Sequence, residues 1–169
     1  MYLVENILQA ETLTVNQPEN LCLVTQTTLS VSDTEEIVLK LKEKFPMLQE
    51  PKSEDICYAT QNRQDAVKQL ALESDLILVV GSENSSNSTR LKELAENCGV
   101  KSFLVDDPEK ISSINLEGVK IMGITAGASA PEELVQQMVS KCSTLGYKVN
   151  QEISGLKEEV FFKLPAELR

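Results

Sequence analysis

The hydrophobic pattern of the chain is clearest at residues 76–80, where five apolar residues follow one another without alternation. Such a run predicts a strand that is buried on both faces, as in a parallel sheet covered by helices. Other apolar runs predict strands elsewhere in the chain. They lie at residues 21–25, 102–105 and 119–124, with weaker candidates at 2–4 and 160–164.

Apolar residues three or four positions apart predict helices between these strands. The apolar stripes span residues 37–45, 66–71, 91–98 and 134–142. Ser32 and Glu35 fit a capping box at the start of the first helix, and Pro131 suits the first turn of the last one. Strands that alternate with helices predict an α/β fold, built from three-layer units in which helices cover both faces of a parallel sheet.

Small polar side chains gather where three of the predicted strands end. Because parallel strands present their carboxyl ends at one edge of a sheet, the loops that follow them can converge on one ligand. Hydroxyl and amide donors at the start of a helix suit an anion, most simply a phosphate. The candidate ligand-binding residues are Thr27, Thr28, Ser85, Ser86, Asn87 and Ser129.

Ordinary structural roles could also explain these side chains. Ser129 and Glu132 fit a second capping box, one or two residues of the loop at 85–87 would suffice to cap a helix, and threonines favour strands. Neither phosphate-loop consensus, G-x-x-x-x-G-K-[ST] or G-x-G-x-x-G, occurs in the sequence. The pattern therefore favours a small phosphate ester or a diphosphate over a nucleotide.

The amino-acid composition limits the classes of molecule that the chain could bind. A net charge of −10 argues against nucleic acid and anionic membranes, because both require a basic surface. No window approaches the roughly 18 to 20 uncharged apolar residues of a membrane span, and the first residues do not resemble a signal peptide. The sequence contains no histidine, so a proton donor near neutral pH would have to be a shifted carboxyl group or a cysteine.

The four cysteines lack the close spacing of a zinc site or a disulfide framework, which favours a reduced, cytoplasmic setting. Cys22, Cys98 and Cys142 lie within apolar patterns, and we expect them to be buried. Cys57 lies outside any such pattern, in a polar connection. It is the candidate ligand of a metal or an iron–sulfur cluster, although one sulfur does not make a complete site.

Four blocks of the sequence resemble, in order and spacing, blocks of hydroxymethylbutenyl diphosphate reductase, the LytB family, which carries out the last step of the non-mevalonate isoprenoid pathway. The resemblance covers nearly the whole chain. The blocks are VTQTTLSV at residues 24–31, DICYAT with NRQ at 55–60 and 62–64, VVGS with NSSNS at 79–82 and 84–88, and TAGASAP at 125–131.

The resemblance implies three α/β units in a trefoil-like arrangement around a 4Fe–4S cluster that three cysteines hold, one from each unit. Two electrons, from a donor of the ferredoxin or flavodoxin type, and protons then remove the hydroxyl of an allylic diphosphate to give isopentenyl and dimethylallyl diphosphate. Cys57 matches the third cluster cysteine, and Thr27 matches a threonine that assists proton delivery. Ser85, Ser86, Asn87 and Ser129 match residues that hold the diphosphate.

The resemblance also implies that parts of the family pattern are missing. Two cluster cysteines, the histidines that hold the diphosphate and the glutamate that donates the proton belong to the family's first unit and the start of its second. We therefore expect an incomplete second unit at residues 1–52, a complete third unit at 53–146 and a C-terminal tail at 147–169. Such a chain is expected to be inactive alone, to be restored by a separate N-terminal polypeptide, and to self-associate through exposed apolar surface.

Two other functions remain open at this point. The chain could be a non-catalytic diphosphate-binding or interaction module that has kept the fold. It could also be an unrelated sugar-phosphate-binding domain with similar loops.

Overall fold

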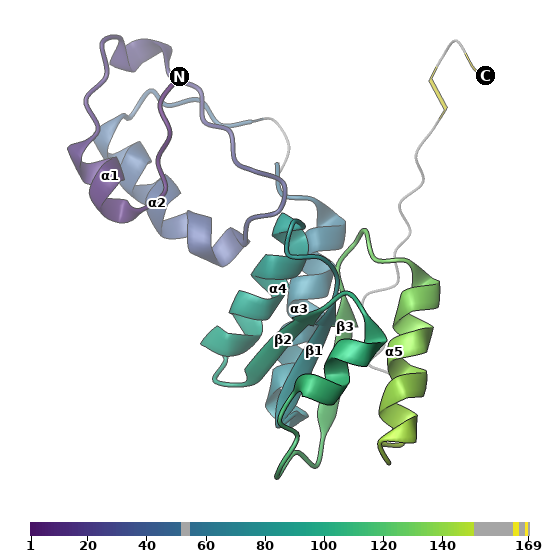
Figure 1. Cartoon of the computed structure of the whole chain (residues 1–169). Coiled ribbons are helices and arrows are strands. Elements are labelled where there is room, and N and C mark those ends of the chain that lie inside the picture. Colours follow the sequence, from purple (N-terminus) through teal and green to yellow (C-terminus); the bar gives the residue numbers. More distant parts are fainter. Residues whose placement is uncertain (52–54, 151–163, 166–167, 169) are drawn as a thin grey trace.

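The structure is a computed structural model that describes residues 1–51, 55–150, 164, 165 and 168. Figure 1 shows a small helical group beside a larger group built on a sheet. The helical group contains α1 (Ile7–Thr12), the 3-10 helix η1 (Pro18–Asn20) and α2 (Val31–Lys44). The larger group contains α3 (Tyr58–Glu73), β1 (Leu76–Val80), α4 (Ser86–Asn97), β2 (Lys101–Val105), the 3-10 helix η2 (Pro108–Ser113), β3 (Met122–Ala126) and α5 (Glu132–Thr144).

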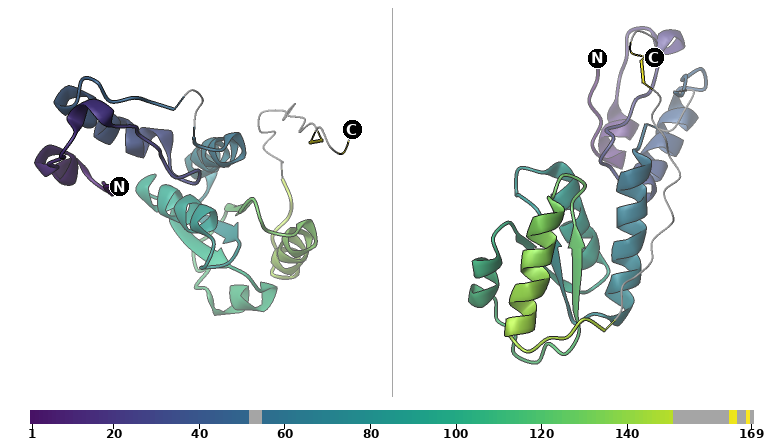
Figure 2. Two further views of the ribbon diagram at one scale, coloured as in Figure 1. Left: turned by 90° about the horizontal axis from the view of Figure 1, so that it is seen from above. Right: turned by 90° about the vertical axis from the view of Figure 1, so that its right-hand side faces the viewer.

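The sheet has three parallel strands in the order β2-β1-β3, so β1 is the central strand. Viewed from above (Figure 2, left), α3 and α4 lie on one side of the sheet, and α5 and η2 lie on the other. The predicted α/β architecture, with a parallel sheet and helices on both faces, is therefore confirmed.

Side chains of β1 alternate between the two faces of the sheet, and both faces are covered. The core between the sheet, α5 and η2 contains the buried residues Leu76, Leu78, Val80, Val105, Ile111, Met138 and Cys142. The core between the sheet, α3 and α4 contains the buried residues Val67, Ile77, Val79, Leu91, Ala95 and Val100. Because neither face of β1 meets water, each of its positions carries an apolar side chain.

The helices run antiparallel to the strands, because each returns the chain to the opposite end of the sheet. α3 ends at Glu73, shortly before β1 begins, so the N-terminus of α3 lies toward the end where β1 finishes. α4 starts from that same end and runs back. Gly99, with φ +84°, then turns the chain into β2, a backbone conformation that favours glycine.

Some predicted elements differ from the structure. The strand predicted at 119–124 is β3 at Met122–Ala126, because the Asp75 carboxylate accepts the N–H groups of Lys120 and Ile121, each at 2.9 Å. The first long helix starts at Val31 after Ser30, so position 32 lies inside the helix and not at its N-cap. Pro131 precedes the last helix instead of lying in its first turn.

The strand predicted at residues 21–25 is reduced to one bridge. Leu23 N donates to Gln49 O at 2.8 Å, and Gln49 N donates to Leu21 O at 3.0 Å. Strand formation requires partners along the whole segment, and among the described residues only Gln49 pairs with it. Residues 2–4 form no strand, and residues 160–163 of the other weak candidate lie outside the described residues.

The helical group has its own small core around the buried residues Ala10, Leu41 and Phe45. It also exposes large apolar side chains, among them Leu3 at 79% and Val24 at 73%. Across the described parts of the chain, no helix combines the length and apolar character needed to cross a membrane.

Candidate functional site

The loops that follow β1 and β3 start side by side at the carboxyl end of the sheet, which we call the carboxyl edge. Gly127 N donates to Val80 O at 2.9 Å, and Gly81 N donates to Val105 O at 3.0 Å. These hydrogen bonds continue the ladders of the sheet for one residue beyond the strands. The ends of all three strands therefore lie level with one another.

The first turn of α4 packs directly onto this edge through Ser88. A Cβ atom added at Gly81 would lie 2.3 Å from Ser88 Oγ, and one added at Gly127 would lie 2.1 Å from it. Real Cβ contacts under 3.0 Å essentially do not occur, so both positions require glycine while Ser88 stays in place. The two strand ends and the start of α4 thus form one closely packed unit.

Ser85 is the N-cap of α4, and its side chain is half-buried. Its Oγ accepts the Ser88 N–H at 3.3 Å and the Ser88 hydroxyl at 3.0 Å. The capping role that the sequence left open for this loop is therefore real for Ser85. Ser86, the first residue of the helix, is exposed and follows the N-cap position.

Asn87 is 7% exposed, and neither of its amide atoms has a hydrogen-bond partner among the described residues. Its Nδ2 lies 3.7 Å from the position of a Cβ on Gly127, which places the amide next to the loop after β3. A buried amide without hydrogen-bond partners lowers the stability of the fold, and such groups are rare in native proteins. A ligand that accepts and donates hydrogen bonds at this point would satisfy it.

Ser129 lies in the exposed part of the loop that joins β3 to α5. The capping box predicted for Ser129 and Glu132 is wrong, because Pro131 is the N-cap of α5 and Glu132 is its first residue. Ala130 N donates to Gly127 O at 3.0 Å, so the loop turns tightly over the carboxyl edge. Ser129 is therefore not the N-cap of α5.

Thr27 and Cys57 lie together although 30 residues separate them. Cys57 N donates to Thr27 O at 3.0 Å. The Asp55 carboxylate accepts the Thr25 N–H at 2.7 Å and lies 3.5 Å from the Thr25 hydroxyl. The loop before α2 is therefore held against the start of α3. This contact brings the backbone of Thr27 next to that of Cys57.

Two further polar contacts continue this junction. Gln64 Nε2 donates to Leu29 O at 3.4 Å, which holds the loop against the side of α3. Thr28 Oγ1 is buried without a hydrogen-bond partner among the described residues. Like the amide of Asn87, it is a polar atom that a bound group could satisfy.

The N-termini of α3 and α4 lie at about the same level. A small hollow between the helices brings Gln64 next to Arg90 and Leu94. Gln64 comes seven residues after Cys57, and Arg90 and Leu94 come five and nine residues after Ser85. Because both helices run in the same direction, Cys57 and Ser85 lie within about one helical turn of the same height. The predicted residues thus gather at one end of the larger group.

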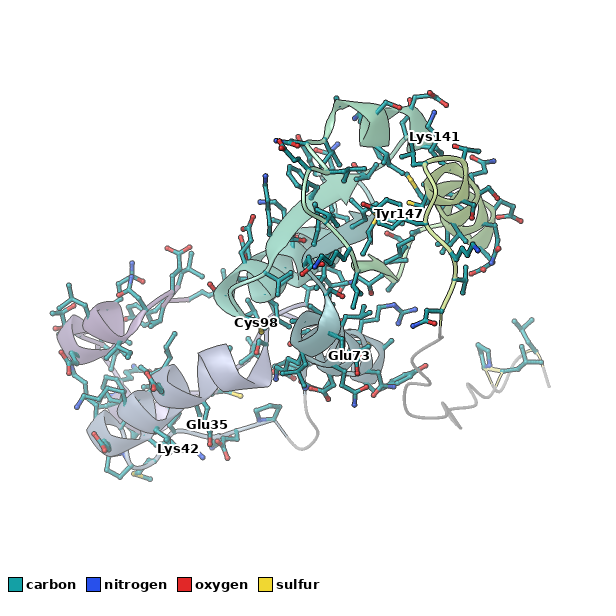
Figure 3. The ribbon with its side chains drawn as sticks, turned by 90° about the horizontal axis from the view of Figure 1, so that it is seen from below. Glu35, Lys42, Glu73, Cys98, Lys141 and Tyr147 are labelled. Atoms are coloured by element: carbon teal, nitrogen blue, oxygen red, sulfur yellow. The ribbon has the colours of Figure 1, made fainter. Side chains whose placement is uncertain are left out.

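Cys57 is exposed and is the N-cap residue of α3. Cys22 and Cys98, which we expected to be buried, are also exposed, so this expectation is wrong for both. Figure 3, seen from below, labels Cys98 and Glu73 at the C-terminal ends of α4 and α3. α4 has 12 residues, which puts Cys98 about 18 Å from the N-terminus of that helix. The helical stripe misled the prediction because the helix ends at Asn97.

Cys142 is buried as expected, and burial raises the pKa of its thiol. Among the described residues, no three histidine, cysteine or carboxylate side chains are placed to hold a metal ion together. A 4Fe–4S cluster normally needs three or four cysteine ligands. The single thiol of Cys57 therefore does not fit a complete cluster site within this part of the chain.

Ser88 is a further residue of this edge that the sequence pattern does not single out, although its hydroxyl hydrogen-bonds to Ser85 and packs against both glycines. Glycines directly after two buried strands were the available signal, because they mark places where another backbone or side chain approaches closely. The hydrogen bond between Asp55 and Thr25 joins residues 30 positions apart, so it depends on the tertiary fold and leaves no local signal in the sequence.

The family model described as LytB protein matches residues 1–143. The chain belongs to the LytB protein family. Curated relatives in this family include the 4-hydroxy-3-methylbut-2-enyl diphosphate reductases of Alcanivorax borkumensis and Aeromonas salmonicida. They are 53% and 52% identical to the chain over all 169 residues, which correspond to 54% of each relative. This LytB-family chain therefore spans about half the length of the curated relatives it matches.

Two solved structures agree with this assignment. The E-1-hydroxy-2-methyl-but-2-enyl-4-diphosphate reductase from Plasmodium falciparum is 37% identical and superposes with a TM-score of 0.75, over 82% of this chain and 44% of that one. A structure of (E)-4-hydroxy-3-methyl-but-2-enyl diphosphate reductase is 30% identical, with a TM-score of 0.51 over 73% of this chain and 43% of the other.

Proposed function

We propose that this LytB-family chain supplies the diphosphate-binding loops and one thiolate of a 4-hydroxy-3-methylbut-2-enyl diphosphate reductase. The observation that carries the proposal is the pairing of two features at one end of the larger group. Cys57 is hydrogen-bonded to the Thr27 loop, and the carboxyl edge presents the unsatisfied amide of Asn87. A thiol beside an edge with an unsatisfied buried amide fits a reductase that acts on an allylic diphosphate.

In this proposal the chain's own residues bind and orient the diphosphate. The hydroxyls of Ser85, Ser86 and Ser129 and the amide of Asn87 donate to its oxygens, assisted by the N-terminus of α4. Thr28 supplies one more donor near the junction with α3. Thr27 lies close enough to Cys57 to position the end of the substrate that reacts and to assist proton delivery.

In the assembled protein a 4Fe–4S cluster would pass electrons to the substrate, and the single thiol of this chain would not hold that cluster alone. We propose that a separate N-terminal polypeptide supplies the remaining cysteines, the histidines and the acidic proton donor. Residues 1–52 would then belong to a unit shared with that polypeptide, residues 53–146 to a complete unit, and residues 147–169 to a tail. A donor of the ferredoxin or flavodoxin type would reduce the assembled protein, and the chain alone would be inactive.

Anaerobic reconstitution with iron and sulfide tests the proposal. The samples are the chain alone, the N-terminal half of the Alcanivorax borkumensis relative alone, and their mixture. We expect cluster absorbance and turnover of the allylic diphosphate only in the mixture. Diphosphate binding by the chain, with no cluster in any sample, would instead support a non-catalytic binding module.

Two cysteine variants make the test specific. Cys57→Ser in the mixture should abolish both cluster absorbance and turnover, because it removes the one thiol at the site. Cys98→Ser is the matched control, since Cys98 is also exposed but lies at the far end of α4. Equal loss with both variants would show that general damage, and not a ligand role of Cys57, causes the effect.

A further inference from the structure

Ser88 is fully buried, yet its hydroxyl is directed at a residue of the carboxyl edge. It donates to Ser85 Oγ at 3.0 Å, while the Ser88 N–H donates to the same oxygen at 3.3 Å. A serine oxygen has two acceptor sites and one hydrogen to donate. Ser88 occupies both acceptor sites of Ser85 Oγ.

The hydrogen of the Ser85 hydroxyl must then point away from Ser88. Ser85 is half-buried, so part of its side chain remains accessible to a ligand at the loop surface. A hydroxyl free to rotate presents a donor or an acceptor to a neighbour, but one whose acceptor sites are filled presents a donor. An anion at the carboxyl edge would meet a Ser85 hydroxyl that is already turned to donate.

The position of Ser88 is itself held from two sides. Its Oγ occupies the space where Gly81 and Gly127 would carry a Cβ atom, at 2.3 and 2.1 Å. The hydroxyl fits there because neither glycine carries a side chain, so a larger residue at either position would displace it. The same contact links the orientation of Ser85 to the loop that carries Ser129.

We propose that Ser88 is a positioning residue that fixes the Ser85 hydroxyl as a hydrogen-bond donor to a diphosphate oxygen. The inference rests on the proposed function, because it takes the carboxyl edge as the diphosphate site. Ser88 itself does not contact the ligand. Its effect on binding passes through Ser85.

Calorimetric titration of the full chain with inorganic pyrophosphate, without metal ions, tests this role. We expect Ser88→Ala to weaken binding about tenfold, the order of effect of one hydrogen bond to a charged group. Ser102→Ala is the matched control: Ser102 is 3% exposed and donates to Ile77 O at 3.1 Å, near the opposite end of the sheet. Ser102→Ala should lower the free energy of unfolding about as much as Ser88→Ala does. It should leave the affinity for pyrophosphate within about twofold of the wild-type value.

A double-mutant cycle shows whether Ser88 affects binding through Ser85 or through the general stability of the loop. If Ser88 acts through Ser85, then Ser85→Ala and the double variant Ser85→Ala/Ser88→Ala bind pyrophosphate equally weakly. A further tenfold loss in the double variant, or equal affinities for Ser88→Ala and Ser102→Ala, would overturn the inference. Should Ser88→Ala not fold, Ser88→Cys replaces the hydroxyl with a thiol, a weak donor on a larger atom, and is judged by the same comparison.

The outcomes also separate this inference from the proposed function. If the wild-type chain binds pyrophosphate but Ser88→Ala binds it equally well, only the positioning role fails. If the wild-type chain does not bind pyrophosphate at all, the carboxyl edge is not a diphosphate site and both fail.

Discussion

Gly127→Ala examines how tightly the end of β3 packs against α4. A Cβ added at Gly127 would lie 2.1 Å from Ser88 Oγ and 3.3 Å from Ser88 Cβ. Ser88 is fully buried, so its hydroxyl cannot retreat into solvent. We expect the free energy of unfolding to fall by about 1–3 kcal/mol, the usual cost of an extra methyl group in a packed interior.

Removing the hydroxyl should relieve most of this strain. In a Ser88→Ala background, the nearest remaining contact of the new methyl group is the 3.3 Å one to the Cβ of residue 88. Ser88→Ala alone should cost about 1 kcal/mol through its lost hydrogen bond. We therefore expect the double variant to be more stable than the sum of the single effects by about 1–2 kcal/mol.

Gly81→Ala is a matched control because its strain has two sources. A Cβ at Gly81 would lie 2.3 Å from Ser88 Oγ and also 2.8 Å from Ser88 Cβ. Ser88→Ala removes only the first contact. The same background should therefore relieve Gly81→Ala less than it relieves Gly127→Ala.

Urea unfolding followed by circular dichroism measures the wild type, the three single variants and the two double variants. Thermal unfolding gives an independent check, with about 2–4 °C of Tm for each kcal/mol in a chain of this size. Strictly additive effects of Gly127→Ala and Ser88→Ala would contradict the packing described here. Equal relief at both glycines would contradict it as well.

Two further predictions concern carboxylates that hold backbone segments. Hydrogen bonds from the N–H groups of Ile121 and Lys120 hold the pKa of Asp75 below its usual value of 3.8, so its stabilising effect is present above that pH and is lost as the pH falls below it. Acid unfolding of the wild type should therefore be steeper below about pH 4 than that of Asp75→Asn, and identical slopes would exclude this role. Asp55→Ala should free the loop at Thr25, so the Cys57 amide exchanges its hydrogen with solvent faster by NMR. Asp55→Asn keeps an acceptor and should leave that exchange rate near the wild-type value. An unchanged rate in Asp55→Ala would show that Asp55 does not hold the loop.

β1 could be predicted from the sequence because its burial determines the type of residue at each of its positions. A strand covered on both faces needs an apolar residue at each position, and residues 76–80 provide that run. The gathering of small polar side chains at residues 85–87 could be interpreted for a related reason, since loops after parallel strands share one edge of the sheet. At these positions the residue types alone indicate the place that each segment takes in the fold.

Residues 21–25 show why a local pattern can fail. Their composition favours a strand, but the ladder depends on a neighbour, and only Gln49 provides one among the described residues. Cys98 failed differently: its spacing continued the stripe of Leu91 and Ala95, but α4 ends one residue earlier. Where a helix ends is less evident from periodicity than the helix itself.

The role of Ser88 could not be predicted from its neighbours in sequence. A serine in the first turn of a helix is usually a local capping residue. What makes this one different is its contact with Gly81 and Gly127, one of which lies 39 positions further along the chain. Only the register of the sheet brings these residues together.

That register has a consequence for how the protein can change. Hydrogen bonds from Gly81 to Val105 and from Gly127 to Val80 continue the ladders that join β1 to its two neighbours. A slip of one residue in either ladder would turn apolar side chains toward the wrong layer and also separate the loops above the sheet. Insertions or deletions within these strands should thus disrupt the packing of the loops at the carboxyl edge together with folding, whereas the outer surfaces of the helices remain free to vary.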